Sequence, residues 1–84
     1  MGDINSMLDL GIIHHNDKNY QAAIDTWSLG AIKDDSRCYY NIGCIYDNLK
    51  NTDETIKHWE KSAELNHKPA IEGLISIYEK NNNF

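Results

Sequence analysis

Apolar residues recur along the chain at the spacing of amphipathic helices. Between Tyr39 and Tyr46, for example, they fall at i, i+3, i+4 and i+7, which puts them on one face of a helix. No segment alternates strictly between apolar and polar residues, so the sequence predicts no strands. We therefore expect an all-α fold. The five predicted helices span residues 4–15, 19–32, 36–48, 53–65 and 69–80.

Polar residues between these segments indicate where the helices begin and end. Asp3 and Asp17 are candidate N-caps for the first and second helices, and Thr52 or Asp53 for the fourth. Short oxygen-bearing side chains suit this position because they accept hydrogen bonds from first-turn amides. Asn66 can adopt the left-handed conformation that ends a helix.

The helical pattern repeats with a period of 32 residues. When the sequence is shifted by 32, Gly11 meets Gly43 and Trp27 meets Trp59, and these are the only two tryptophans in the chain. A glycine inside a helix costs about 1 kcal/mol relative to alanine. We expect each missing Cβ to let the tryptophan of the paired helix pack closely. The predicted single domain, residues 1–84, divides into repeat one at 4–35, repeat two at 36–67 and a half repeat or capping helix at 68–84.

The composition adds limits on function. The chain has 84 residues, 40% of them hydrophobic and 25% charged, as in an ordinary soluble domain. Thirteen acidic and eight basic side chains give a net charge of −5, which disfavours binding to nucleic acid or to a membrane surface. No apolar run approaches the roughly 20 residues that span a bilayer. The acidic first residues lack a basic region followed by an apolar stretch, so we expect no signal peptide.

The two cysteines favour a reducing compartment. Cys38 and Cys44 lie six residues apart in one predicted helix, a rise of about 9 Å, which exceeds the roughly 7 Å limit for a disulfide. Thiols without a disulfide framework fit an intracellular protein. The expected location is the cytoplasm, or the host cytoplasm if the protein is viral.

No residue pattern in the chain indicates catalysis. His14 and His15 are adjacent, so on a helix they point about 100° apart and cannot readily bind one metal. Nucleophile-elbow, metalloprotease, phosphate-loop and dinucleotide motifs are all missing from the sequence. We predict no catalytic residue, no metal and no cofactor. An enzyme without a recognisable motif stays open, ranked third after the two functions described below.

Two segments resemble the tetratricopeptide repeat, in its Sel-one-like variant. Residues 40–46, Y-N-I-G-C-I-Y, resemble the Y-N-L-G-x-x-Y helix of that variant, and residues 61–70, K-S-A-E-L-N-H-K-P-A, resemble its K-A-A-E-x-G-H-x-x-A junction. The chain departs from the pattern at His14, Thr55 and Ile75, which replace a tyrosine, an alanine and a glycine. The resemblance implies a short right-handed solenoid of antiparallel helical hairpins, about two and a half repeats long.

The resemblance also implies a function in protein–protein interaction, as an adaptor or scaffold. The first helices of the hairpins would line a concave surface that binds a partner peptide or helix. Asp47, Glu72 and Glu79 would give this surface an acidic rim, which suits a partner with apolar anchors and a basic flank. The alternative is that these are ordinary solvated side chains. The predicted partner-binding residues are Leu8, Ile12, His15, Arg37, Tyr40, Cys44, Asp47, Glu72, Ser76 and Glu79.

The last predicted helix carries more apolar residues than one buried face needs. Without a following helix to cover it, part of its surface would be exposed. This suggests an alternative function as a structural element that dimerises through the last helix. The residues predicted for self-association are Ile75, Ile77 and Tyr78.

Overall fold

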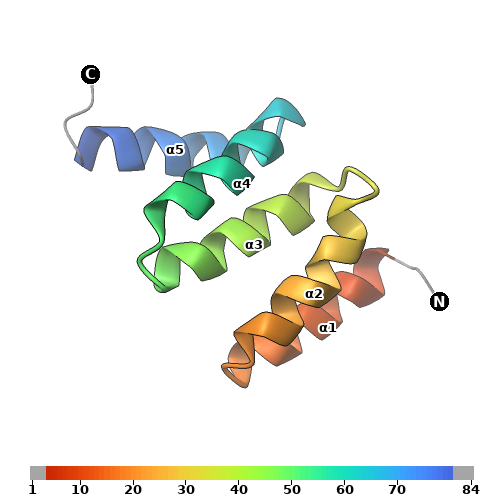
Figure 1. The fold of residues 1–84 in the computed structure, drawn as a ribbon. Helices are drawn as coiled ribbons and strands as arrows, with labels where there is room; N and C mark the ends of the chain where they lie inside the picture. The colour runs from red at the N-terminus through yellow and green to blue at the C-terminus, as the bar shows by residue number, and fades with distance from the viewer. Residues whose placement is uncertain (1–3, 81–84) are drawn as a thin grey trace.

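A computed structural model describes residues 4–80 as five α-helices joined by short turns (Figure 1). No strand occurs in that range, and the predicted all-α fold class is confirmed. Each predicted range lies within one residue of the observed helix at both ends. The helices are α1 (Ile4–Asn16), α2 (Tyr20–Ala31), α3 (Ser36–Asn48), α4 (Thr52–Glu64) and α5 (Lys68–Lys80).

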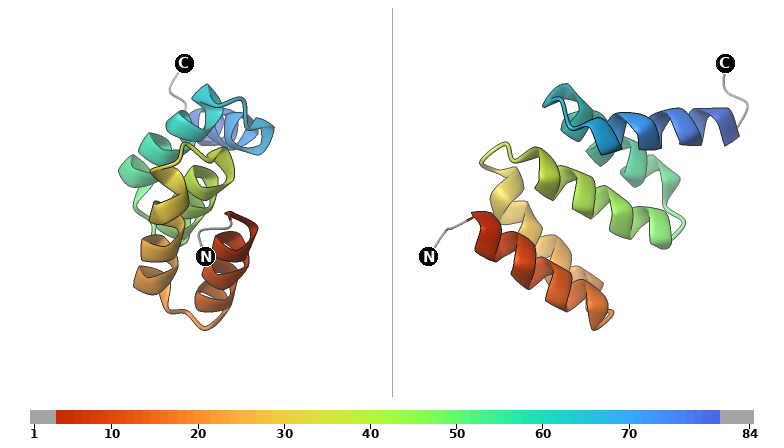
Figure 2. Two further views of the ribbon diagram at one scale, coloured as in Figure 1. Left: turned by 90° about the vertical axis from the view of Figure 1, so that its right-hand side faces the viewer. Right: turned by 180° about the vertical axis from the view of Figure 1, so that it is seen from behind.

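The helices stack in chain order as a solenoid of antiparallel hairpins. Each helix packs against the next, and α1 also touches α3. The stack is elongated, with principal extents of 44 × 26 × 15 Å, and α1 and α5 lie at its opposite ends (Figure 2). The first helices of the hairpins therefore follow one another along the stack. α1 lies beside α3, and α5 lies on the other side of α3.

The four turns share one backbone conformation. Each contains a residue with positive φ, and these residues are exactly 16 positions apart: Lys18, Asp34, Lys50 and Asn66. The amide of the following residue donates to a carbonyl five positions earlier, as from Asn51 to Tyr46 at 2.9 Å. This is the six-to-one bond of a Schellman motif, which satisfies a carbonyl at the helix end. The left-handed conformation predicted for Asn66 is confirmed.

The helix N-caps differ from those predicted. Asn51, rather than Thr52 or Asp53, accepts the amide of Glu54 at the start of α4. At the start of α2 the cap position is held by Asn19 and not by Asp17, and Asn19 forms no side-chain cap bond. At α2 the turn runs two residues past the predicted cap, whereas at α4 the cap lies one or two residues before the predicted positions. Asp3 lies outside the described residues.

The N-cap of α3 is Asp35, a residue that the sequence analysis did not predict as a cap. Asp35 accepts the amides of Arg37 and Cys38 and also binds the Arg37 guanidinium at 2.9 Å. The hydrogen bond from Arg37 holds the pKa of Asp35 below its ordinary value.

Two apolar clusters make up the core, one for each tryptophan. Trp27 and Trp59 are nearly fully buried, and a Cβ at Gly11 or Gly43 would collide with the facing indole. Trp27 Nε1 donates to the Leu8 carbonyl at 3.3 Å, and Trp59 Nε1 donates to the Tyr40 carbonyl at 3.0 Å. Each bond spans 19 residues, and the predicted packing of tryptophan on glycine is confirmed.

Candidate functional site

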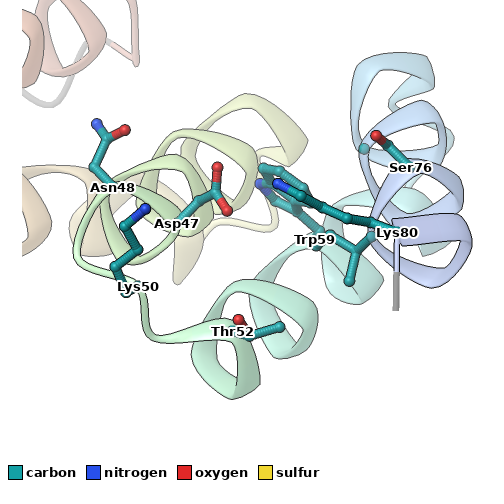
Figure 3. A pocket seen from close by; sticks show the side chains of 9 residues that line it. Asp47, Asn48, Lys50, Thr52, Trp59, Ser76 and Lys80 are labelled. Atoms are coloured by element: carbon teal, nitrogen blue, oxygen red, sulfur yellow. The ribbon is translucent and has the colours of Figure 1, made fainter. Parts of the chain in front are cut away.

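A cavity of about 500 Å³ lies between the C-terminal end of α3, the α3–α4 turn and α5 (Figure 3). Trp59 of α4 forms its floor. Figure 3 shows the Asp47 side chain of α3 pointing toward the Trp59 ring, with Ser76 of α5 on the far side. The lining residues are Asp47, Asn48, Lys50, Thr52, Trp59, Gly73, Ser76, Ile77 and Lys80.

Two glycines place the indole of Trp59 at the floor of this cavity. Gly43 lets α3 approach the pyrrole side of the ring, and Gly73 lets α5 approach the benzo side, since a Cβ at either position would collide with the ring. Gly73 also lines the cavity. Any side chain at residue 73 would therefore meet the indole or enter the space above it.

Behind the floor the aromatic side chains form a column. The Tyr40 ring stacks on Trp59, with centroids 5.6 Å apart and planes 18° apart, and its other neighbour is His67 at 5.1 Å. Burial raises the pKa of the Tyr40 hydroxyl to about 12, and burial also raises the pKa of the adjacent Cys44 thiol. Both groups are therefore neutral at pH 7 and add no charge behind the Trp59 ring.

The charged groups at the cavity are one carboxylate and two ammonium groups. Asp47 lies in the last turn of α3, Lys50 lies in the turn that follows, and Lys80 ends α5. Between residues 4 and 80 none of these three takes part in an ion pair. The cavity can therefore offer both signs of charge to a ligand beside an apolar floor.

Only some of the residues predicted for the partner surface line the cavity. Asp47 and Ser76 line the cavity. Tyr40 and Cys44 are half-buried against Trp59, behind the cavity wall. Glu72 and Glu79 are exposed on α5 but do not line it, so the cavity has lysines where the sequence suggested an acidic rim.

The predicted residues of the first hairpin lie away from the cavity. Leu8 is half-buried in the Trp27 cluster, whereas Ile12 is exposed. His15 is half-buried beside Tyr20 and Trp27, and its Nε2 lies 3.5 Å from the side-chain amide of Asn48. This contact connects α1 to the end of α3 that borders the cavity.

Arg37 is exposed, but two interactions engage its guanidinium. It pairs with Asp35 at 2.9 Å and lies 3.5 Å from the side-chain oxygen of Asn5. The residues predicted for self-association differ in their exposure to solvent. Ile75 is 52% exposed, whereas Ile77 and Tyr78 are half-buried against the Trp59 cluster.

Sequence reasoning missed most of the cavity lining. It treated Trp59 as core and did not consider Lys50, Lys80 or Gly73. Gly73 did carry a signal, because a helical glycine outside the repeat's own glycine position has a cost that needs a reason. Lys50 and Lys80 carried no such signal, since their place at the cavity depends on how α5 packs against α3 and α4.

The sequence over this site can be compared with known families. Residues 36–69 match the tetratricopeptide repeat. The matched segment contains α3, α4 and the first two residues of α5, so it includes Trp59, Gly43 and one wall of the cavity. Tetratricopeptide repeats are generally non-catalytic modules of protein–protein interaction. No curated relative matches the chain.

Residues 4–80 contain no group of three or more His, Cys, Asp or Glu side chains placed to hold a metal ion. None of the five helices is long and apolar enough to cross a membrane.

Proposed function

We propose that the protein is a non-catalytic interaction module that binds an extended segment or helix of a partner protein in the cavity between α3 and α5. The observation that carries this proposal is the cavity of about 500 Å³ above Trp59. Its volume lies within the range of ligand-binding pockets, about 300–1,000 Å³, and is enough for one or two side chains. The match of residues 36–69 to the tetratricopeptide repeat supports the same function.

The lining suggests how a partner is recognised. An apolar anchor would cover the Trp59 edge and Ile77, the apolar part of the lining. A basic side chain next to the anchor would pair with Asp47, and an acidic group would pair with Lys50 or Lys80. The partner would thus keep the basic flank expected from the sequence, which pairs with Asp47. It would also carry an acidic residue, which the sequence did not suggest.

Further features of this proposal follow from the sequence. The chain would be one domain with repeats at 4–35 and 36–67 and a half repeat at 68–84, of the Sel-one-like variant. It would act as an adaptor or scaffold. Cys38 and Cys44 are both free, which supports a reducing compartment such as the cytoplasm. The net charge of −5 supports a protein partner over nucleic acid or a membrane surface.

The proposal can be tested with peptides selected from a random displayed library on the intact protein. Isothermal titration calorimetry would then compare the wild type with Ser76→Trp, which fills the cavity from the exposed side of α5. We expect Ser76→Trp to abolish binding. Asp47→Asn should weaken basic peptides about fivefold, or ~1 kcal/mol.

Asp25→Asn is the matched control, because Asp25 is exposed on α2 and does not line the cavity. It should leave the affinity unchanged. If the selected peptides bind Ser76→Trp as tightly as the wild type, or if the selection yields no binder, the proposal is wrong.

The alternative function is self-association through α5. Ile71 and Ile75 lie one turn apart on this helix and are 40% and 52% exposed. Sedimentation equilibrium from micromolar to near-millimolar protein separates the two functions. A mass of 9.7 kDa at all concentrations favours the interaction module. A dimer that Ile75→Asp dissociates would favour the structural element.

A further inference from the structure

The helices α1, α3 and α5 are the first helices of their hairpins. In α3 and α5, equivalent positions pack against the helix that comes just before in the chain. In α3 these positions hold Cys38, Ile42 and Ile45, which are 0%, 2% and 0% exposed. They pack in one cluster with three residues of α2 at i, i+4 and i+8, namely Ala23, Trp27 and Ala31. In α5 the equivalent residues Ala70 and Leu74 pack in the same way against Trp59 of α4.

The same positions in α1 are open. Leu10 and Ile13 are one repeat before Ile42 and Ile45, yet they are 47% and 56% exposed. We call these two residues the outer stripe of α1. A solvated end of a helical stack normally carries polar residues at such positions. The outer stripe instead keeps apolar residues at two of the three positions that α2 covers on α3, and the third position holds Ser6.

Charge distinguishes the outer stripe from its equivalent in α3. Asp9 and Asp17 lie four residues before and after Ile13, so both border the stripe. Their equivalents in α3 are Asn41 and Leu49, which are neutral. Neither aspartate takes part in an ion pair among residues 4–80, and α1 contains no Lys or Arg. A helix that covers the outer stripe would therefore need basic residues that α2 does not need against α3.

The packing of α2 on α3 also gives the orientation of such a helix. The C-terminal end of α2 meets the first turn of α3, because a Cβ at Gly30 would collide with the Cys38 sulfur. The N-terminal end of α2 thus lies toward the C-terminal end of α3. A helix placed in the same way on α1 would begin next to Asp17, where its positive N-terminal dipole is favourable.

We propose that the outer stripe of α1 binds a basic amphipathic helix of a partner protein, in the place that α2 occupies on α3. The partner helix carries small, aromatic and small residues at i, i+4 and i+8 to cover Leu10 and Ile13. Its lysines or arginines pair with Asp9 and Asp17. A second copy of the chain is a poorer occupant, because two α1 helices would bring the four aspartates together.

The segment that covers α3 supplies a probe for this surface. A helix-stabilised peptide of residues 18–33 contains the Ala23, Trp27 and Ala31 pattern, with two lysines and one aspartate. Its Asp25→Lys version is more basic by two charges. Fluorescence anisotropy of the labelled peptides would measure their affinity for the intact protein. We expect both to bind, the Asp25→Lys peptide more tightly.

Variants of the protein locate the bound peptide. Ile13→Ser should weaken binding about tenfold, because it replaces an apolar side chain that the bound helix would bury. Asp17→Asn should remove the advantage of the Asp25→Lys peptide. Leu29→Ser is the matched control, since Leu29 is 54% exposed on α2 and lies outside both proposed surfaces. It should bind as the wild type does.

Three results would overturn the proposal. The first is no binding of either peptide at millimolar protein. The second is equal affinity for the wild type and Ile13→Ser. The third is a homodimer that Ile13→Ser dissociates, which would make a second copy the occupant. Binding at α1 and binding in the α3–α5 cavity are independent, because Ser76→Trp leaves the outer stripe intact.

Discussion

The two hairpins, α1–α2 and α3–α4, have the same interior and different surroundings. Each packs one tryptophan on one glycine and directs the indole N–H to a carbonyl 19 residues earlier. However, α3 packs between α2 and α4, whereas α1, within residues 4–80, packs against α2 and makes a smaller contact with α3. The comparison shows that the repeat determines the interior of a hairpin, and that its place in the stack determines which surfaces are open.

A second difference concerns what faces the tryptophan. Trp59 has a glycine on each side, Gly43 on α3 and Gly73 on α5, whereas the residue equivalent to Gly73 at the first tryptophan is Asn41. At the second hairpin two glycines thus flank the indole, and one of them, Gly73, also lines the cavity.

The largest expected effect is the loss of either tryptophan. Trp59→Ala and Trp27→Ala should each lower the free energy of unfolding by about 3–5 kcal/mol, which approaches the whole stability of a small domain. Urea denaturation measures both. Because Trp59 also contacts α5, its loss should additionally increase hydrogen exchange in α5. A loss below about 1 kcal/mol at Trp59 would contradict its place at the centre of the second cluster.

Equivalent isoleucines give the sharpest contrast between the hairpins. Ile45→Ser should cost about 2–5 kcal/mol, because Ile45 is fully buried between α2 and α3. Ile13→Ser replaces the same position of α1, where the side chain is 56% exposed, and should stay within about 0.5 kcal/mol. Thermal or urea unfolding of the two variants compares them directly. Equal losses would mean that the outer stripe of α1 is covered in the free protein.

The glycines should show an intermediate effect. Gly43→Ala and Gly11→Ala each gain about 1 kcal/mol in helix propensity but place a Cβ against an indole, and overpacking costs about 1–3 kcal/mol. We expect a net loss of up to about 2 kcal/mol at both positions. A more stable variant at either position would show that the ring can shift without losing its hydrogen bond.

The cap of α3 should contribute less to stability than the tryptophans or the buried Ile45. Asp35→Ala should lower the free energy of unfolding by about 1 kcal/mol at pH 7. Because the pKa of Asp35 is lowered in the folded protein, its charged form contributes stability above its ordinary pKa of about 4, and this contribution is lost as the pH falls through the folded value.

Urea unfolding at pH 7 and pH 2.5 measures this dependence. The difference between the wild type and Asp35→Ala should shrink at the lower pH. Asp35→Asn, which keeps a side-chain acceptor, should lose less than Asp35→Ala at pH 7. A difference that grows toward low pH would contradict the stated role of the carboxylate.

Much of the fold could be predicted because it depends on local periodicity. The stripe of apolar residues and the 32-residue period give five helices, and the paired Gly11 and Trp27 give the packing of one hairpin. The turns were harder to predict. Lysine has no preference for positive φ, yet Lys18 and Lys50 adopt it, since the surrounding helix packing fixes the turn.

The site was less predictable because its parts meet only through packing. Asp47 and Ser76 follow from the repeat register, and both line the cavity. The position of Lys80 at the cavity depends on the angle at which α5 packs on α4, and no local sequence pattern encodes this angle. The outer stripe of α1 likewise becomes visible only when the exposure of Ile13 is compared with that of Ile45.

The most direct test of the proposed function is a proton–nitrogen NMR titration of the labelled protein with a library-selected peptide. The account predicts that the largest shifts fall on the amides of Asp47, Lys50, Ser76 and Ile77 and on the indole N–H of Trp59. Shifts confined to α1 and α2, with these signals unchanged, would contradict binding in the cavity between α3 and α5.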